Sequence, residues 1–274
     1  MKKNNAILFS APYIAWMLAF TLIPLAVVGY YALTDPATGV FSLTNLQSLN
    51  AYWGVLWESI LYSLVSAFIC LLLGYPVAYY IAHQGPVAQK LLYMLVMLPM
   101  CMSFLLRTLA WVGLLQDTGI INDILEAVGI GRRQLIRTPG AVILGMVYNY
   151  LPYMILPLYS TIVKINPRLI EAAEDLGCNT LQVFRLVTLP LSIPGILSGI
   201  TMVFVPAVST FYISQKLGNP MDTVLIGDII ERLFKQANNP NLGAALSLVL
   251  MLLVFVCTGI MNRFGADEEG GVIA

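Results

Sequence analysis

The chain has 274 residues, of which 59% are hydrophobic and 10% are charged, and its formal net charge at pH 7 is zero. Because soluble domains are about a quarter charged, this composition excludes an ordinary soluble globule and favours a membrane protein. The zero net charge argues against nucleic-acid binding through phosphates. The four cysteines are scattered and His83 is the only histidine, which excludes a zinc or iron site built from Cys and His.

Six apolar runs are long enough to cross the roughly 30 Å of membrane hydrocarbon. Each must be helical, because an isolated strand cannot satisfy its backbone in lipid. We therefore expect an all-α membrane protein with one six-helix domain over residues 1–274. The first run is longer than the signal-peptide core of about 7–15 residues and is interpreted as an uncleaved span. The predicted spans cover residues 13–33, 60–81, 91–115, 141–163, 195–214 and 242–261.

Prolines interrupt several predicted spans. Pro99 lies inside the third span, with Arg107 towards its end. Because proline removes a backbone donor and clashes with the preceding turn, we expect a kink or break near Pro99. Pro152, Pro157 and Pro206 lie within the fourth and fifth spans. In transporters such broken helices let backbone groups line a cavity.

The connections between spans differ in character. Residues 116–140 carry charges of both signs, and residues 223–236 form an amphipathic stretch, which predicts a surface helix on the membrane or on a partner. In the expected six-span topology, lysine and arginine are divided almost evenly between the two sides of the membrane. The positive-inside rule therefore does not decide the orientation. The Met-Lys-Lys start favours a cytoplasmic N-terminus, and six spans then place the C-terminus there as well.

A polar segment over residues 166–190 separates the fourth and fifth spans. Asn166 and Pro167 suit a helix start, and we expect the acids of this segment to lie early, at the positive end of the helix dipole. Gly177 permits a turn, after which Asn179 or Thr180 can cap a second short helix. The sequence thus predicts a helix–turn–helix, for which an ordinary amphipathic connector is the alternative.

The same segment closely resembles the EAA loop of ABC importer permeases. That pattern runs Glu-Ala-Ala, three residues, Gly, nine residues, an apolar residue, any residue, then Leu-Pro. Every fixed position matches, with Val in the slot where the family more often has Ile. The matching residues are Glu171, Ala172, Ala173, Gly177, Val187, Leu189 and Pro190.

The resemblance implies the type I, MetI-like permease fold, with a cytoplasmic coupling helix between the fourth and fifth spans. In this family the loop docks into a cleft of a separate ATPase subunit, whose closure moves the spans and alternates access to a central path. The chain itself is then not an enzyme and binds no cofactor; ATP and Mg belong to the ATPase. No G-x-x-x-x-G-K-[ST] loop occurs here. The expected coupling residues are Glu171, Ala172, Ala173, Asp175 and Gly177.

Resemblance extends along the chain to the spermidine/putrescine-type permeases. Residues 99–111, 149–160 and 206–214 look like the corresponding segments of that family, in particular of its B-type subunit. This implies a polyamine substrate and a bacterial cell (inner or plasma) membrane. The implied partners are a second, C-type permease, two ATPase copies and an extracytoplasmic polyamine-binding protein docking on residues 116–140 and 215–241. Importers of iron, thiamine, phosphonate or opines share the superfamily and stay open as alternatives.

A linear polycation needs carboxylates, carbonyls and aromatic faces. The candidate residues of the substrate path and gate are Phe211, Tyr212, Trp111, Tyr148, Tyr153, Asp117 and Glu58. Each has an alternative role that involves no substrate. The aromatic residues could belong to the belt at the membrane interface, Glu58 could cap its helix, and Asp117 could pair with Arg107.

Other functional classes explain the sequence less well. A secondary carrier would leave the 166–190 segment unexplained and would need ion-coupling acids within the spans, where they are scarce. An intramembrane enzyme needs a nucleophile–base pair or a metal set, yet there is one histidine and no Gly-x-Ser-x-Gly, so no catalytic residue is predicted. A purely structural membrane subunit stays open and would lack ATP-coupled flux.

Overall fold

The structure is a computed structural model that describes residues 2–35, 39–237 and 239–269. These residues form helices joined by short connections, with one isolated bridge between Thr34 and Phe41. The chain divides into two compact units. Unit 1 comprises residues 1–54 and 229–253, and unit 2 comprises residues 55–228 and 254–274.

Unit 1 is held together by contacts between small residues and by hydrogen bonds to the carbonyl of Thr34. Its helices are α1 (Lys2–Ala32), α2 (Thr44–Gln47), η1 (Ser48–Tyr52), most of α13 (Ile226–Lys235) and the first part of α14 (Pro240–Glu269). Ala32 and Ala244 are buried against each other's helices, where the absence of long side chains permits close approach. The carbonyl of Thr34 accepts hydrogen bonds from the amides of Asn45 at 2.9 Å and Asn241 at 2.7 Å. These bonds tie α1 to α2 and α14.

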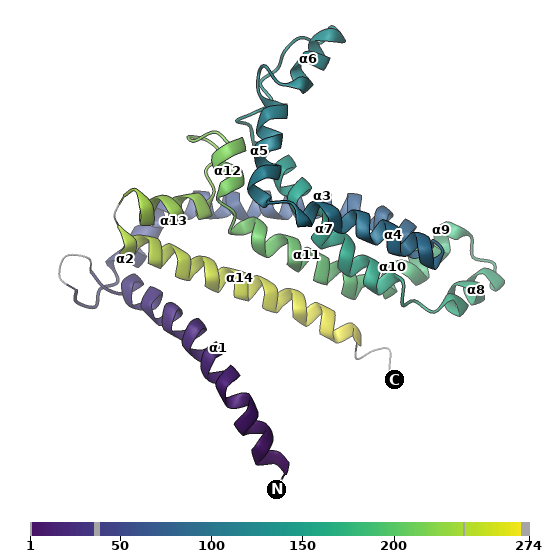
Figure 1. Cartoon of the computed structure of the whole chain (residues 1–274), viewed down its shortest axis with the longest axis horizontal. Coiled ribbons are helices and arrows are strands. Elements are labelled where there is room, and N and C mark those ends of the chain that lie inside the picture. Colours follow the sequence, from purple (N-terminus) through teal and green to yellow (C-terminus); the bar gives the residue numbers. More distant parts are fainter. Residues whose placement is uncertain (1, 36–38, 238, 270–274) are drawn as a thin grey trace. The chain divides into compact units, whose positions relative to one another are not determined.

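Unit 2 contains the remaining helices, of which α3, α7 and α11 lie side by side (Figure 1). Its core is formed by fully buried apolar side chains such as Met146, Met154 and Leu158 on α7. The helices are α3 (Trp53–Ala82), α4 (Pro86–Met97), η2 (Leu98–Cys101), α5 (Phe104–Leu115), α6 (Ile120–Ala127), α7 (Pro139–Ile162), α8 (Pro167–Asp175), α9 (Thr180–Val183), η3 (Phe184–Thr188), α10 (Leu189–Leu191), α11 (Ile193–Val208), α12 (Tyr212–Leu217) and the start of α13 (Ile226–Lys235).

Two glycines let α11 approach α7 closely. Gly195 and Gly199 are four residues apart and so face the same side of α11. A Cβ at Gly199 would lie 2.6 Å from Sδ of Met154, and one at Gly195 would lie 2.7 Å from Oγ1 of Thr161. This small-xxx-small arrangement is a common basis of helix packing in membranes. It joins the two helices that flank the polar segment.

The third predicted span is two helices. Helix α4 ends at Met97, a short 3₁₀ turn follows, Met102 is extended with ψ 148°, and α5 begins at Phe104. The predicted break near Pro99 is confirmed, and the apolar helical stretch long enough to cross a membrane begins at Phe104. Proline cannot donate to the preceding turn, and the extended residue that follows redirects the chain into α5.

Among the described residues, five helical stretches are long and apolar enough to cross a membrane, or six if one bent pair is counted. The pair is bent by 62° between its halves. The five stretches are Pro12–Ala32, Thr44–Ala82, Phe104–Ala127, Pro139–Ile162 and Pro240–Met261, and the bent pair is Thr180–Leu191 with Ile193–Val208.

The amphipathic stretch predicted over 223–236 forms helix α13, but a purely surface position is wrong for its beginning. Leu225, Ile226 and Asp228 are buried. The backbone N–H of Ile226 donates to Oγ of Ser59 at 2.8 Å, which anchors the start of this helix to α3. Exposed polar residues occur only towards its end, so amphipathicity here reflects packing within the chain.

Candidate functional site

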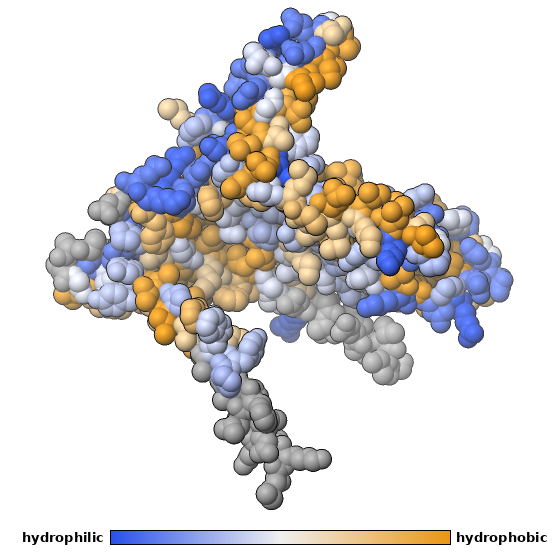
Figure 2. Space-filling model, in the orientation of Figure 1, coloured by the Kyte–Doolittle hydropathy of each residue, from blue (hydrophilic) through white to orange (hydrophobic). Residues whose placement is uncertain are grey.

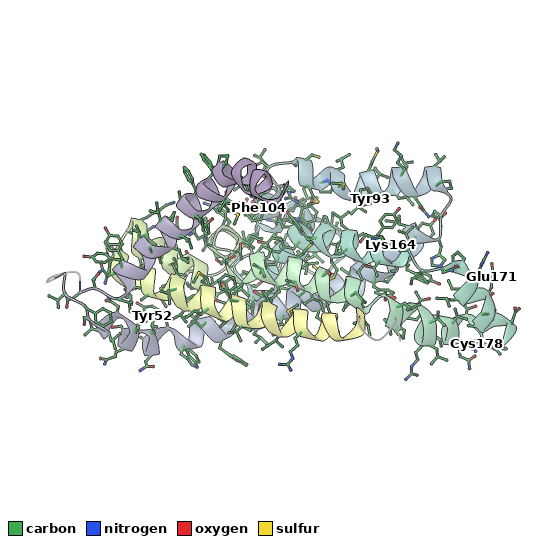
Figure 3. All side chains as sticks on the ribbon, turned by 90° about the horizontal axis from the view of Figure 1, so that it is seen from below. Tyr52, Tyr93, Phe104, Lys164, Glu171 and Cys178 are labelled. Carbon is green, nitrogen blue, oxygen red and sulfur yellow. The ribbon has the colours of Figure 1, made fainter. Side chains whose placement is uncertain are left out.

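The polar segment forms a helix–turn–helix at one end of unit 2. Helix α8 lies outermost (Figure 1), and α9 lies beside the last turns of α3, where Leu181 and Tyr79 line one pocket. Glu171 and Cys178 lie farther out than Lys164 (Figure 3). This end is largely hydrophilic, whereas apolar residues cover much of the adjoining helices (Figure 2). We call residues 166–190 the α8–α9 loop.

The first helix of the loop has sequence-encoded ends. Pro167 occupies its first turn, and the side chain of Asn166 accepts from the N–H of Arg168 at 3.1 Å. At the other end, Gly177 has φ +88°. Its N–H donates to the backbone carbonyl of Glu174 at 2.8 Å, and the N–H of Cys178 donates to the backbone carbonyl of Ala173 at 3.1 Å. This pair of bonds is the Schellman motif, which explains why the pattern needs glycine at this position.

The second helix begins with a capping box. The side chain of Asn179 accepts from the N–H of Gln182 at 2.9 Å, and the side chain of Gln182 accepts from the N–H of Asn179 at 2.8 Å. Both bonds satisfy donors that a helix start otherwise leaves unpaired. The predicted second helix is therefore confirmed, with Asn179 and not Thr180 as its cap.

The loop returns to the membrane helices through the π-helical turn η3. The N–H of Leu189 donates to the backbone carbonyl of Phe184, five residues earlier. Pro190 has no N–H and so cannot form the next hydrogen bond of an α-helix. Phe184 meets Tyr75 edge-on at 5.6 Å between ring centroids. The hydroxyl groups of Tyr75 and Ser192 lie 2.8 Å apart in a buried hydrogen bond. The end of the loop is thus fastened to α3.

The acids of the loop do not stabilise α8. Glu171 lies in the middle of the helix, and Glu174 and Asp175 lie in its last turn. The prediction that they cluster at the positive end of the helix dipole is wrong, because negative charge in the last turn is unfavourable. All three are exposed, and no ion pair of the described residues includes them. These carboxylates are available to a partner.

Apolar side chains accompany the acids on this surface. Leu176 is 86% exposed and Leu181 is 74% exposed. Ala172 is exposed and Ala173 is partly buried. Because both side chains are single methyl groups, they leave room for a partner to approach the helix closely. An exposed surface that mixes leucine with unpaired carboxylates is typical of an interaction site.

The predicted aromatic residues lie on α5, on α7 and at the start of α12. Trp111 meets Tyr148 edge-on at 5.4 Å between ring centroids. The ring centroids of Tyr212 and Phe104 lie 6.2 Å apart. Sequence reasoning missed Phe104, although it precedes Trp111 by seven residues and so shares a helix face with it. We call the set the aromatic surface: Phe104, Trp111, Tyr148, Tyr153, Phe211 and Tyr212. Three of its members are more than a third exposed, namely Tyr148, Tyr153 and Phe211.

The two predicted carboxylates lie on different elements. Glu58 is exposed on α3, whose first residue is Trp53, so a helix-capping role for Glu58 is wrong. Asp117 lines a polar pocket after α5. It forms no ion pair with Arg107 among the ion pairs of the described residues, and Nε and Nη1 of Arg107 are buried without a hydrogen-bond partner. The alternative pairing of these two residues is therefore wrong.

An all-helical membrane domain that presents a doubly capped polar loop between two closely packed helices defines the permease component of an ABC importer. Residues 71–266 match the family of binding-protein-dependent transport system inner membrane components. The chain belongs to this family. It is accordingly a multi-pass membrane protein whose transport depends on a binding protein and on a separate ATPase.

Relatives cover almost the whole chain. The spermidine/putrescine transport system permease protein PotB of Haemophilus influenzae is 40% identical over 96% of this chain and 95% of its own length. PotB of Escherichia coli is 35% identical over 88% of this chain and 90% of its own length. Among solved structures, a bacterial ABC transporter involved in alginate import contains a chain with TM-score 0.77 and 20% identity, covering 97% of this chain and 96% of that one. This last similarity concerns the fold.

Proposed function

We propose that this chain is a permease subunit of an ATP-driven polyamine importer, of the kind that moves spermidine or putrescine into the cytoplasm. The observation that carries the substrate class is the 40% identity over nearly the whole chain to a spermidine/putrescine permease. The α8–α9 loop, with its unpaired carboxylates, carries the coupling to ATP hydrolysis. No observation favours iron, thiamine, phosphonate or opine as the cargo.

The working complex contains this chain, a related C-type permease, two ATPase copies that bind ATP and Mg, and an extracytoplasmic polyamine-binding protein. The α8–α9 loop faces the cytoplasm, and so do both termini. Residues 116–140 and 215–241 face outwards. This orientation brings the loop to the ATPase and the opposite end of unit 2 to the binding protein.

In this proposal the loop transmits force because its shape is fixed by its own hydrogen bonds. The Schellman turn at Gly177 and the capping box at Asn179 hold α8 and α9 at a set angle. Glu171 offers its carboxylate to a basic residue in the ATPase cleft, where charge-assisted hydrogen bonds are strong. Closure of the two ATPases then displaces the loop together with α7 and α11.

The aromatic surface is the proposed contact of the cargo. Its exposed rings present π faces to ammonium groups, an attraction of about 0.5–2 kcal/mol per contact. Phe211 and Tyr212 follow α11 directly and form the proposed gate. Glu58 and Asp117 are the proposed carboxylate contacts. A lower maximal uptake in Glu58→Gln or Asp117→Asn, at saturating binding protein, would support these two roles.

ATP-dependent uptake into proteoliposomes that contain the full complex tests the function. Labelled spermidine is competed with putrescine, thiamine, ferric ion and an aminophosphonate. Competition by putrescine alone is the expected result. ATP-dependent uptake of another competitor would overturn the polyamine assignment, and absence of any ATP-dependent flux would overturn the importer assignment.

Coupling is tested separately by charge reversal in the loop. Glu171→Arg is expected to abolish uptake or to release the ATPase while the chain stays inserted in the membrane. The neutral variant Glu171→Gln keeps the shape of the side chain and isolates the contribution of its charge. Full ATP-dependent uptake by Glu171→Arg would show that the coupling assignment is wrong.

A further inference from the structure

A second polar site lies before the first residue of α7, at the end of that helix opposite to the α8–α9 loop. It is a pocket of about 380 Å³ between the end of α5, the residues that lead into α7, and α12. Its charged and amide lining consists of Gln116, Asp117, Gln134, Arg137, Gln215 and Lys216. We call it the outer pocket.

The charges of the outer pocket suit an anion. Its lining contains one carboxylate, Asp117, and two cations, Arg137 and Lys216, so its formal charge is positive. Like charges brought together cost free energy, whereas opposite potentials favour association. A carboxylate is therefore a good ligand for the two cations of this pocket.

The two cations are not neutralised by a carboxylate in the described part of the chain. No ion pair of the described residues includes Arg137 or Lys216. The neighbouring Arg132, by contrast, contacts Glu126 at 2.8 Å and Asp123 at 3.1 Å. The hydrogen bond to Glu126 raises the pKa of Arg132. Arg132 is thus engaged internally, and the pocket cations are the ones left for a partner.

Arg137 occupies an unfavourable backbone conformation. Its φ is +60°, in the left-handed region, which costs a residue other than glycine about 1–2 kcal/mol. Its N–H donates to the carbonyl of Leu217 at 2.9 Å, and this bond fixes the chain beside α12. Residues held in this way cluster at ligand clamps. Glycine would relieve the strain, but it would remove the guanidinium from the pocket.

Lys216 is positioned from the other wall of the pocket. It lies in the last turn of α12, and its Nζ is 5.8 Å from the ring centroid of Tyr212. A cation over a ring face is held by the quadrupole of the ring. A planar guanidinium, which binds carboxylates in a bidentate manner, and an ammonium group thus flank one cavity.

We propose that the outer pocket receives an aspartate or glutamate side chain of the extracytoplasmic binding protein. The proposal rests on the orientation given above, in which this end of unit 2 faces outwards. Arg137 and Lys216 bind the incoming carboxylate, and the amide groups of Gln116 and Gln134 lie in the same lining to donate further hydrogen bonds. Asp117 lowers the affinity of the pocket for this carboxylate.

A zero-length cross-link tests the contact directly. A carbodiimide joins a lysine amine to a carboxylate only when the two are adjacent, so treatment of the full complex with its binding protein should link Lys216 to an Asp or Glu of that protein. Peptide mass spectrometry identifies the pair. Cross-links of the binding protein to other lysines of the complex, with none at Lys216, would overturn the proposal.

Charge removal tests the energetic role. In Lys216→Gln and Arg137→Asn, where Asn still tolerates the left-handed conformation, the concentration of binding protein that half-saturates ATPase stimulation should rise about tenfold. Added salt should shrink this difference, because 1 M salt reduces the Debye length to about 3 Å. The maximal rate should not change. Arg133→Gln removes an exposed cation of the same segment that does not line the pocket, and it should raise the half-saturating concentration less than either pocket variant does.

Three outcomes would refute the proposal. Half-saturation could be unchanged in both variants, it could rise equally in Arg133→Gln, or Lys216→Gln could alter only the maximal rate, which would place Lys216 on the cargo path. Asp117→Asn should act in the opposite direction on docking: it should lower the half-saturating concentration of binding protein, whatever its effect on maximal uptake. Cross-linking and ATPase stimulation do not depend on which cargo is carried, so a failed polyamine assignment would be recognised separately.

Discussion

Replacing Gly177 with alanine isolates the backbone requirement of the α8–α9 loop. No atom lies within 4 Å of a Cβ built at Gly177, and its φ is +88°. The substitution therefore causes no clash, and its whole cost is that of a left-handed alanine, about 1–2 kcal/mol. Because the turn is exposed, this cost shifts the local equilibrium away from the Schellman geometry by a factor of about 5–30. We expect ATP-dependent uptake and ATPase retention to fall by a comparable factor.

Two variants make this prediction specific. Gly177→Asn keeps a residue that tolerates the left-handed region, so it should retain most of the uptake. Gly129→Ala introduces the same local strain, since Gly129 has φ +85° and no atom within 4 Å of its Cβ position, but it lies after α6, far along the chain from the loop. It should leave coupling intact. Uptake by Gly177→Ala equal to that of the wild type, or equal losses in Gly177→Ala and Gly177→Asn, would refute the backbone argument.

Three further predictions concern packing. Tyr75→Phe removes the buried hydrogen bond to Ser192 and should destabilise the complex by about 1 kcal/mol, seen as a lower apparent melting temperature; an unchanged value would show that this bond is not needed. Gly199→Val forces new atoms against Met154, only 2.6 Å from the Cβ position, and should cost about 1–3 kcal/mol, measured by thermal inactivation of uptake; an unaffected half-life would contradict the close packing. Arg107→Met replaces a buried charge whose Nε and Nη1 lack partners, so the isolated chain should be equally or more stable in detergent; a loss of about 3–5 kcal/mol would instead reveal an ion pair.

Local chemistry made the α8–α9 loop predictable from the sequence. Asn166 with Pro167, Gly177 and Asn179 each satisfy a helix end through short-range hydrogen bonds, and such bonds depend on spacing along the chain. The break near Pro99 was predictable for the same reason. Where local signals compete, as between Asn179 and Thr180 for the second cap, the sequence alone left the choice open.

Contacts between distant segments were not predictable. The outer pocket joins residues of α5, the segment before α7 and α12, and nothing in their spacing brings them together. The left-handed Arg137 carries no sequence signal, because arginine is not a residue that favours this region. The start of α13 was expected at the surface because its pattern is amphipathic, yet burial of Asp228 and the bond from Ile226 to Ser59 place it inside unit 2.

The close contact of α7 and α11 has a mechanical consequence. The α8–α9 loop leaves from the end of α7 and returns into the start of α11, and at Gly195 and Gly199 the backbone of α11 lies directly against Thr161 and Met154 of α7. This close contact opposes a change of spacing or register between the two helices when the loop is pushed. A push on the loop is therefore expected to rotate α7 and α11 together as one rigid body. The rotation angle is then the same at both ends of the two helices.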